Sequence, residues 1–379
     1  VPLGLRFAAA LPDFEIYTLD HRGVGQSTRL GCSQEASLTA ADASVPRDDA
    51  GRQELGAAWA GCIDEAKRAW GDGLAQFSTS NAARDLARAI DLTRKQGEKV
   101  FVYGVSYGTY WAHRYAQIFP SQPAGVVLDS IVPSEGLALQ RFDEGFEIAG
   151  RKLADLCKAD ALCASKLGAD PWAKLQAIRA EMRAGHCPAF GFTDEDRELW
   201  SSLLVLWEAR PVVLAALHRF DRCSPEDVTV LRAMRDRLRF VFAPASSDHF
   251  SQLLNFDVAF SELWDKPGPS RDAIEQSAAA AVFAVGASAQ YSVQAIFPAY
   301  TPDAFFHGWA APTVPTLMLN GTMDTQTPIE VAQIAQAHLV GPNQRFVAIP
   351  LGDHGLVDQS PVKTPRTEAC GFQIIASWL

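Results

Sequence analysis

Short apolar runs separated by amphipathic stretches occur at both ends of the chain. The runs FEIYTLD, KVFVYGVS and AGVVLDSIV come early, and PTLMLNG and RFVAIP come late. Each run is almost continuously hydrophobic, which is typical of strands buried on both faces of a parallel sheet. The pattern therefore predicts strands over 14–20, 99–106, 124–132, 315–321 and 345–350.

Amphipathic stretches between these runs predict helices. In 81–97, Ala82, Leu86 and Ile90 recur at helical spacing, and Gly97 suits the carboxyl end of a helix. Further helices are predicted over 107–119, 330–339 and 367–379. Alternating strands and helices predict an α/β fold with a parallel sheet.

The middle of the chain has a different pattern. From about 134 to 305 it is rich in Ala, Leu, Trp and charged residues and contains no comparable apolar run. This pattern predicts a mostly helical cap, 134–305, between two parts of one α/β core, 1–133 and 306–379. The cap aromatics can pack in its core or line a pocket, and both readings remain open; they are Trp200, Trp207, Phe250, Phe256 and Trp264.

A serine stands between two glycines where a predicted strand meets a predicted helix. The sequence Gly104-Val105-Ser106-Tyr107-Gly108 fits the G-x-S-x-G pattern of a strained turn that exposes a nucleophilic serine. The two glycines would let the strand and the helix approach closely. Ser106 is therefore the predicted nucleophile, and the backbone N–H of Tyr107 is the predicted oxyanion donor.

A serine nucleophile needs a base, and that base needs an orienting acid. Of the eight histidines, His354 lies in a loop just after a late strand, whereas His113 and His338 lie in helical stretches. Asp324 follows the strand 315–321, so its carboxylate should leave the same sheet edge. The order Ser106, Asp324, His354 is the order of α/β-hydrolase triads.

Two other acids compete with Asp324. Asp353 adjoins His354 in the chain and should point elsewhere, and Asp129 is expected to be a structural loop residue.

Composition and charge restrict the function. The net charge of −10 gives no electrostatic reason to bind nucleic acid or an anionic membrane. No apolar run approaches the roughly 20 residues that span a bilayer. No zinc-ligand spacing is present, and the proposed chemistry needs no metal or organic cofactor.

Seven cysteines bear on the compartment. Cys157 and Cys163 flank a short loop and predict a local disulfide; Cys32 with Cys62 and Cys187 with Cys223 are plausible further pairs. At least one thiol, such as Cys370, is left over. Such pairs favour an oxidising compartment and a secreted or periplasmic protein. Buried free thiols in a cytosolic enzyme remain the alternative, because sequence does not fix connectivity.

Several quoted segments together resemble the S33 serine peptidases of the α/β-hydrolase fold, the prolyl and tripeptidyl aminopeptidase-like branch. They are YTLDHRGVGQS, YGVSYGTYWAHRYAQIFP, VVLDS, LNGTMDTQTP, GDHG and the Cys-containing carboxyl-terminal helix. The resemblance runs along both core parts and more weakly through the cap. It implies an α/β-hydrolase core with a helical cap, and an exported aminopeptidase that releases short N-terminal units.

The cap carries one further match. The family often has a V-x-C-[AS]-E segment, and here that segment contains Phe260 in place of the cysteine and ends at Glu262. The resemblance implies that Glu262 holds the α-ammonium group of a peptide, with Glu144 and Glu147 as rivals. A second family cysteine is replaced by Phe297, so a hydrophobic contact is expected to take the place of that disulfide.

One family segment is missing from this sequence. The resemblance implies an HGGPG or PGGPG stretch, with a second oxyanion donor, ahead of the strand 14–20. We expect that the active protein contains this stretch and the first strands upstream of Val1, either in a longer chain or in a separate one.

Three functions follow as hypotheses. The first is an aminopeptidase in which Ser106 forms an acyl-enzyme. The second is a carboxylesterase or amidase on small molecules with the same triad. The third is a catalytically dead hydrolase-fold binding protein.

Overall fold

The computed structural model describes residues 3–42, 49–242, 250–286, 290–311, 313–364 and 367–379. Its one multi-stranded sheet within these ranges has four parallel strands in the order β1-β2-β3-β4. They are β1 (Phe101–Ser106), β2 (Gly125–Ile131), β3 (Thr316–Gly321) and β4 (Gln344–Ile349). Four of the five predicted strands are therefore confirmed, within a residue or two at each end.

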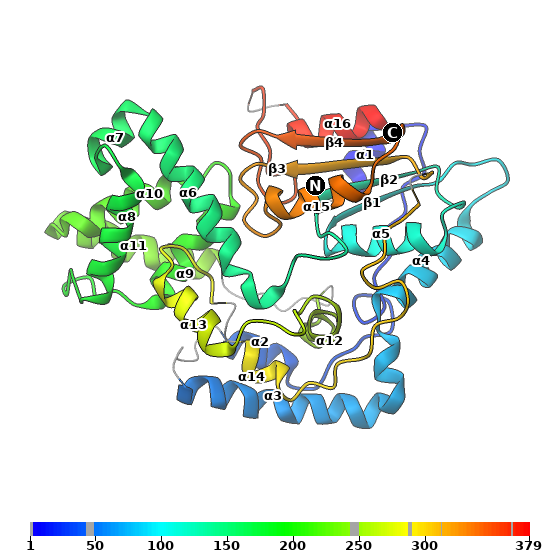
Figure 1. Ribbon diagram of the computed structural model, residues 1–379, viewed down its shortest axis with the longest axis horizontal. Coiled ribbons are helices and arrows are strands. Elements are labelled where there is room, and N and C mark those ends of the chain that lie inside the picture. Colours follow the sequence, from blue (N-terminus) through cyan, green and yellow to red (C-terminus); the bar gives the residue numbers. More distant parts are fainter. Residues whose placement is uncertain (1–2, 43–48, 243–249, 287–289, 312, 365–366) are drawn as a thin grey trace.

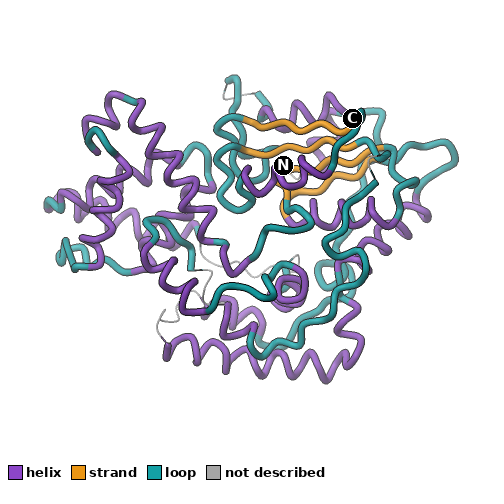
Figure 2. The backbone as a smooth tube through the Cα atoms, viewed as in Figure 1, coloured by secondary structure: helices purple, strands orange, loops and turns teal. Residues whose placement is uncertain are grey.

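Helices cover both faces of the sheet (Figure 2). On one face, β-strand side chains pack with α4 (Thr79–Thr93), α5 (Tyr107–Ile118) and α15 (Ile329–His338). On the other face they pack with α1 (Leu3–Ala10) and α16 (Cys370–Trp378). The four helices predicted beside the strands are confirmed. Two boundaries differ by three or more residues. The helix α4 ends at Thr93, and Gly97 lies in a following turn with φ of 88°. The helix α16 begins at Cys370 and not at 367.

The prediction of a strand over 14–20 is wrong. The segment has no ladder hydrogen bonds, and Ile16, Tyr17 and Leu19 are exposed. Its composition suits a strand, but a strand exists only when a neighbouring strand supplies its hydrogen bonds. Here the segment meets the sheet through side chains, such as the contact between the Phe14 and Phe101 rings.

Between β2 and β3 the described chain forms only helices, as the pattern predicted. We call residues 139–294 the helical segment. Its larger part lies to one side of the sheet, at the ends toward which the strands point (Figure 1). This part comprises η2 (Leu139–Arg141), α6 (Asp143–Ala159), α7 (Ala161–Leu167), α8 (Pro171–Arg183), α9 (Asp194–Ser202), η3 (Leu203–Val205), α10 (Arg210–Arg222), α11 (Pro225–Val241) and α13 (Arg271–Ala280).

A second helical layer joins distant parts of the chain. It combines α2 (Glu35–Asp42), α3 (Asp49–Trp70) and η1 (Gly71–Gln76) with α12 (Gln252–Glu262) and α14 (Tyr291–Gln294). Trp59 and Phe256 meet edge to face in its core, with ring centroids 5.0 Å apart. Residues 30–77 therefore pack against residues 253–297, although some 180 residues of chain separate them.

The cysteines pair as the spacing suggested. Disulfides join Cys32 to Cys62, Cys157 to Cys163, and Cys187 to Cys223, and Cys370 is free. Phe260 and Phe297 pack edge to face with centroids 5.6 Å apart. The two rings therefore make the hydrophobic contact that was expected between these positions.

The aromatic side chains of the helical segment mostly serve its core. Trp200 belongs to the core of α6–α11, whereas Phe256 and Trp264 belong to the layer with α3. Trp207 is half-buried and Phe250 is exposed.

Candidate active site

The serine turn has the strained backbone that its motif predicts. Ser106 ends β1 and directly precedes α5, with φ of 57° and ψ of −129°. Positive φ is unfavourable for a residue with a Cβ and is found where the surrounding structure imposes it, often at functional sites. A Cβ added at Gly104 would lie 2.2 Å from the carbonyl oxygen of Gly108, so only glycine fits at that position.

The second glycine of the motif is less constrained. A Cβ added at Gly108 would meet no heavy atom within 4 Å. The close approach between strand and helix is therefore made by the Gly108 backbone against Gly104, and the expectation that both positions exclude a side chain holds for Gly104 alone. Tyr107 is the first residue of α5, so its N–H has no acceptor within the helix.

His354 and Asp324 meet across the ends of two neighbouring strands. Nδ1 of His354 lies 3.1 Å from each carboxylate oxygen of Asp324. Asp324 is fully buried and also accepts N–H groups of Gln326 and Thr327 at 2.9 and 2.8 Å, which fixes its orientation. Thr327 Oγ1 donates to Asp324 Oδ2 at 2.8 Å.

The electrostatics of His354 follow from this pairing. Burial of the imidazole lowers its pKa, but the charge of Asp324 and the hydrogen bond to it outweigh burial, and the pKa is raised above its usual value. A base with a raised pKa is well suited to accept a proton from a hydroxyl group.

The turn that carries His354 lies against the serine strand. Val105 Cγ2 is 4.0 Å from the position that a Cβ of Gly355 would occupy. Ser106 Oγ makes no hydrogen bond within the described part of the chain, and so none to the imidazole in this arrangement. Such bonds are often long in unliganded enzymes and shorten when substrate binds.

The two rival acids have other roles. Asp129 is fully buried and accepts N–H groups of Leu356 and Val357 at 3.0 and 3.3 Å, and Tyr103 OH at 3.0 Å. It therefore supports the loop after His354, as expected of a structural residue. Asp353 pairs with Arg210 and accepts the backbone N–H of His354 at 2.8 Å. Burial raises its pKa to about 6, although Arg210 lowers it.

The other candidate bases pack elsewhere. His113 Nε2 accepts the N–H of Ala310 at 3.0 Å, and burial lowers its pKa to about 3. His338 stacks on Trp309 with centroids 4.3 Å apart.

Glu262 lies in a buried polar network at the end of α12. Its carboxylate accepts from Arg114 Nη2 and Tyr110 OH, both at 2.9 Å, from Tyr300 OH, and from Thr79 N–H at 3.3 Å. The Arg114 and Glu262 side chains are 2% and 1% exposed. Sequence reasoning singled out Glu262 but missed these partners, because they are spread over positions 79 to 300.

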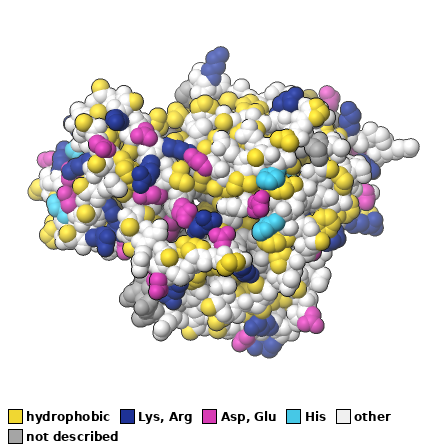
Figure 3. Space-filling model, in the orientation of Figure 1, with side chains coloured by type: hydrophobic (Ala, Val, Ile, Leu, Met, Phe, Trp, Pro, Cys, Tyr) yellow, Lys and Arg dark blue, Asp and Glu magenta, His cyan; other side chains and the backbone are white. Residues whose placement is uncertain are grey.

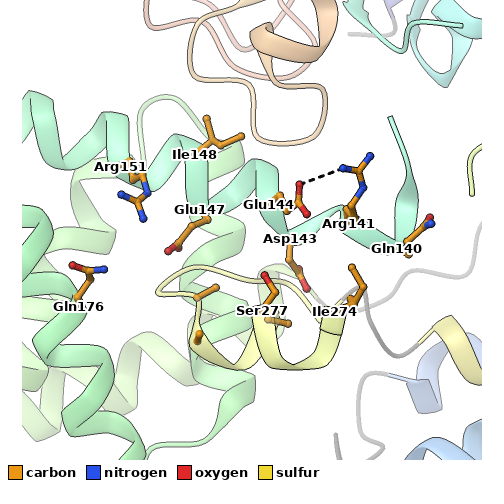
Figure 4. A pocket seen from close by; sticks show the side chains of 13 residues that line it. Gln140, Arg141, Asp143, Glu144, Glu147, Ile148, Arg151, Gln176, Ile274 and Ser277 are labelled. Atoms are coloured by element: carbon orange, nitrogen blue, oxygen red, sulfur yellow. Dashed lines mark ion pairs between the residues drawn. The ribbon is translucent and has the colours of Figure 1, made fainter. Parts of the chain in front are cut away.

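A cavity of about 470 Å³ lies between α6 and α13 (Figure 4). Its lining is mostly polar and includes both rivals of Glu262, namely Glu144 and Glu147. Glu147 Oε2 accepts the N–H groups of Val282 and Phe283 at 3.0 and 3.1 Å, and burial raises its pKa. Neither Ser106 nor His354 lines this cavity. On the face of the molecule shown in Figure 3, acidic and basic side chains lie next to each other.

A smaller hollow lies between the cavity and the loop that carries Asp324, which we call the acid loop. It is lined on one side by Glu144 and Ile148, which also line the cavity, and on the other by Gln326 and Pro328. Gln326 and Pro328 stand within four residues of Asp324. Within the described ranges no group of three or more His, Cys, Asp or Glu side chains could hold a metal ion.

Sequence comparison supports the architecture. The family model described as "alpha/beta hydrolase fold" matches residues 4–164, which include Ser106. The chain has an α/β-hydrolase fold. Three features of this fold position the candidate site. They are the parallel sheet, the helices on both of its faces, and the turn from strand to helix that carries the serine.

Two curated relatives extend the comparison. The chain is 32% identical over 148 residues to tripeptidyl aminopeptidases of Streptomyces lividans and Streptomyces coelicolor. The match covers 34% of this chain and 26% of each relative, so the chain spans about a quarter of their length. A solved structure of a thermophilic esterase from Thermogutta terrifontis aligns with 17% identity and a TM-score of 0.25, covering 73% of this chain and 65% of that one.

No helix in the described residues has both the length and the hydrophobicity needed to cross a membrane.

Proposed function

We propose that the protein is a serine hydrolase in which Ser106, His354 and Asp324 form the catalytic triad. One observation carries the proposal: the strained serine turn ends β1 beside the turn that holds His354, and Asp324 orients that imidazole from the next strand end. The arrangement matches the roles of nucleophile, base and orienting acid.

The chemistry follows from these roles. Ser106 Oγ attacks the substrate carbonyl carbon while its proton passes to His354 Nε2, and the N–H of Tyr107 stabilises the oxyanion. His354 then protonates the leaving amine or alcohol, and the acyl-enzyme forms. Water, deprotonated by His354, attacks the acyl carbon and releases the acid and the free serine.

We infer further that the substrate is a peptide with a free amino terminus. The partial relationship to two tripeptidyl aminopeptidases supports this substrate class. The helical segment at the strand ends would act as a cap, as the boundaries 1–133, 134–305 and 306–379 predict. Three disulfides support an extracellular or periplasmic location.

Three carboxylates are candidates to bind the ammonium group of the substrate. Glu262 has the carboxylate that a charge-assisted hydrogen bond requires, but four donors already occupy it. An ammonium group would have to displace one of them. Glu147 and Glu144, which line the cavity, are the second candidates. If none of the three binds an amine, the esterase or amidase hypothesis gains support.

A matched substrate panel tests the proposed class. Alanyl, prolyl and Ala-Ala-Pro naphthylamides, each free and N-acetylated, are compared with p-nitrophenyl butyrate. We expect cleavage of the free amines and loss of activity on acetylation. Hydrolysis of the ester with no preference for a free amine would contradict the aminopeptidase assignment and favour the esterase.

Replacement of Glu262 by Gln distinguishes a role in binding the substrate ammonium group from a role in stabilising the fold. The change removes the closer of the two acids that pair with the buried Arg114 cation among the described residues and leaves only Asp303, 3.9 Å away, so unfolding free energy should fall by about 3 kcal/mol. If Glu262 also binds the ammonium, KM for free amines rises while hydrolysis of the ester stays near wild type, measured well below the melting temperature. Glu147→Gln and Glu144→Gln are the matched variants, and a KM rise confined to either would move the anchor to the cavity.

A further inference from the structure

The loop that carries His354 is held firmly at its far end. Gly355 N–H donates to Ser130 Oγ at 2.8 Å, and Leu356 N–H donates to Asp129 at 3.0 Å. Both acceptors lie at the end of β2. The sheet therefore fixes the chain just after His354. Before His354, Leu351 N–H donates to Thr322 Oγ1 at 2.9 Å, and Gly352 O accepts the N–H of Met323 at 3.0 Å.

The near end of the loop is held by a side chain from another part of the molecule. Arg210 Nε donates to Asp353 Oδ2 at 3.0 Å, and Nη2 donates to the same oxygen. Arg210 Nη1 donates to the carbonyl of Leu351 at 2.9 Å. One guanidinium group thus binds the loop at two points, one and three residues before His354.

Asp353 passes this restraint on to His354. Its second oxygen, Oδ1, accepts the backbone N–H of His354 at 2.8 Å. The carboxylate is fully buried, and the Asp353 N–H donates to Gln359 O at 2.7 Å. The carboxylate therefore bridges the guanidinium group and the backbone of the histidine.

Arg210 itself is fixed in the helical segment. It is the first residue of α10, is 4% exposed, and its Nε lies 3.3 Å from Leu204 O in η3. Nearby, Trp207 N–H donates to Gln359 Oε1 at 3.3 Å. The restraint on the histidine loop therefore comes from a buried, hydrogen-bonded residue that is 143 residues distant from Asp353 in the chain.

We propose that Arg210 is a positioning residue for His354, acting through Asp353 to hold the imidazole in line with Ser106 and Asp324. This inference rests on the proposed triad for its catalytic consequence. Arg210 acts at a distance and takes no part in the proton transfers. Displacement of a catalytic group by about 1 Å can reduce the rate of reaction by about 100-fold, so a lost restraint should be visible in kcat.

A purely structural buried ion pair is the competing explanation, and the chain contains a matched example. Arg235 binds Asp196 through Nε at 2.5 Å and Nη2 at 2.8 Å, and Asp196 is 1% exposed. Both residues lie in the helical segment, and neither contacts the His354 loop. Arg235→Met therefore controls for the loss of a buried pair of the same kind.

The experiment compares Arg210→Met, Arg210→Lys and Arg235→Met with the wild-type chain. Hydrolysis of p-nitrophenyl butyrate gives kcat and KM, and hydrogen exchange of the 351–357 amides reports on the loop. We expect Arg210→Met to lower kcat by about 10- to 100-fold with little change in KM, and to speed exchange in 351–357. Arg210→Lys should restore part of both, and Arg235→Met should alter neither.

Two results would overturn the inference. One is equal kcat in Arg210→Met and Arg235→Met, and the other is unchanged exchange of 351–357 in Arg210→Met. If Arg210→Met does not fold, Arg210→Gln, which removes the charge and the guanidinium group, carries the same comparison, and wild-type exchange and kcat in it would count against the role. Absence of wild-type hydrolysis of both the ester and the free-amine naphthylamides would instead contradict the proposed function, while the exchange data would still decide whether Arg210 holds the loop. If only the naphthylamides are hydrolysed, kcat and KM are measured on them.

Discussion

At the level of individual residues, Asp324 controls the orientation and the pKa of the His354 imidazole. Because Asp324 raises the imidazole pKa against the effect of burial, kcat/KM should rise with pH through a value above the usual 6.5, where the base becomes neutral. Asp324→Asn removes the charge, so that limb should move to lower pH and kcat should fall on the order of 10³- to 10⁴-fold. A pH–rate profile of both proteins on one ester checks this, and an unmoved limb would show that Asp324 does not orient the base.

Asp257 is a buried acid outside the proposed triad. Its side chain is fully buried, and neither carboxylate oxygen has a hydrogen-bond partner among the described residues. Burial, followed by the nearby charge of Glu262, raises its pKa to about 8. Because the folded state then holds a proton that the unfolded state releases, this group reduces stability as pH rises from about 4 to 8.

Asp257→Asn should remove that pH dependence. We expect the free energy of unfolding of the variant, relative to wild type, to increase between pH 5 and pH 8, by at most about 1.4 kcal/mol per unit. Urea unfolding at several pH values measures it, with the exposed Asp155→Asn as control. An equal difference between variant and wild type at pH 5 and pH 8 would show that Asp257 does not keep its proton on folding.

At the level of secondary-structure elements, the serine turn determines how closely β1 and α5 approach each other. A Cβ at Gly104 would overlap the Gly108 carbonyl, whereas a Cβ at Gly108 would meet open space. Gly104→Ala should therefore reduce the free energy of unfolding by about 3 kcal/mol or more. Gly108→Ala should leave it unchanged or raise it by up to about 1 kcal/mol, because Gly is a poor helix former. Chemical denaturation distinguishes the two, and equal effects would contradict this geometry.

Local pattern predicted most elements but not their partners. Four strands and their flanking helices follow from apolar runs and helical spacing, which are properties of the segments themselves. The segment 14–20 has the same composition and forms no strand, because pairing depends on a neighbour that local sequence does not specify. Likewise, Ser106, Asp324 and His354 carry recognisable local signals, whereas nothing near Arg210 in sequence indicates that it reaches the His354 loop.

In the molecule as a whole, the helical segment contacts the loops and the helix that carry the proposed triad. Lys152 of α6 donates to Thr322 O at 3.0 Å beside the acid loop. Arg210 of α10 binds Asp353, and Glu262 of α12 binds Arg114 on the nucleophile helix α5. These pairs are separated by 143 to 170 residues in sequence. The triad geometry is therefore a property of the folded whole, which explains why the motifs located the residues but not what holds them.

Reaction with a fluorophosphonate probe would show directly whether Ser106 is an activated nucleophile. An activated serine attacks phosphorus, and mass spectrometry locates the adduct. We expect one adduct per chain, on the peptide that contains Ser106. The adduct should be absent in Ser106→Ala and should form much more slowly in His354→Ala. A folded wild-type chain that does not react, or that reacts equally after Ser106→Ala, would contradict the claim that this turn carries an activated nucleophile.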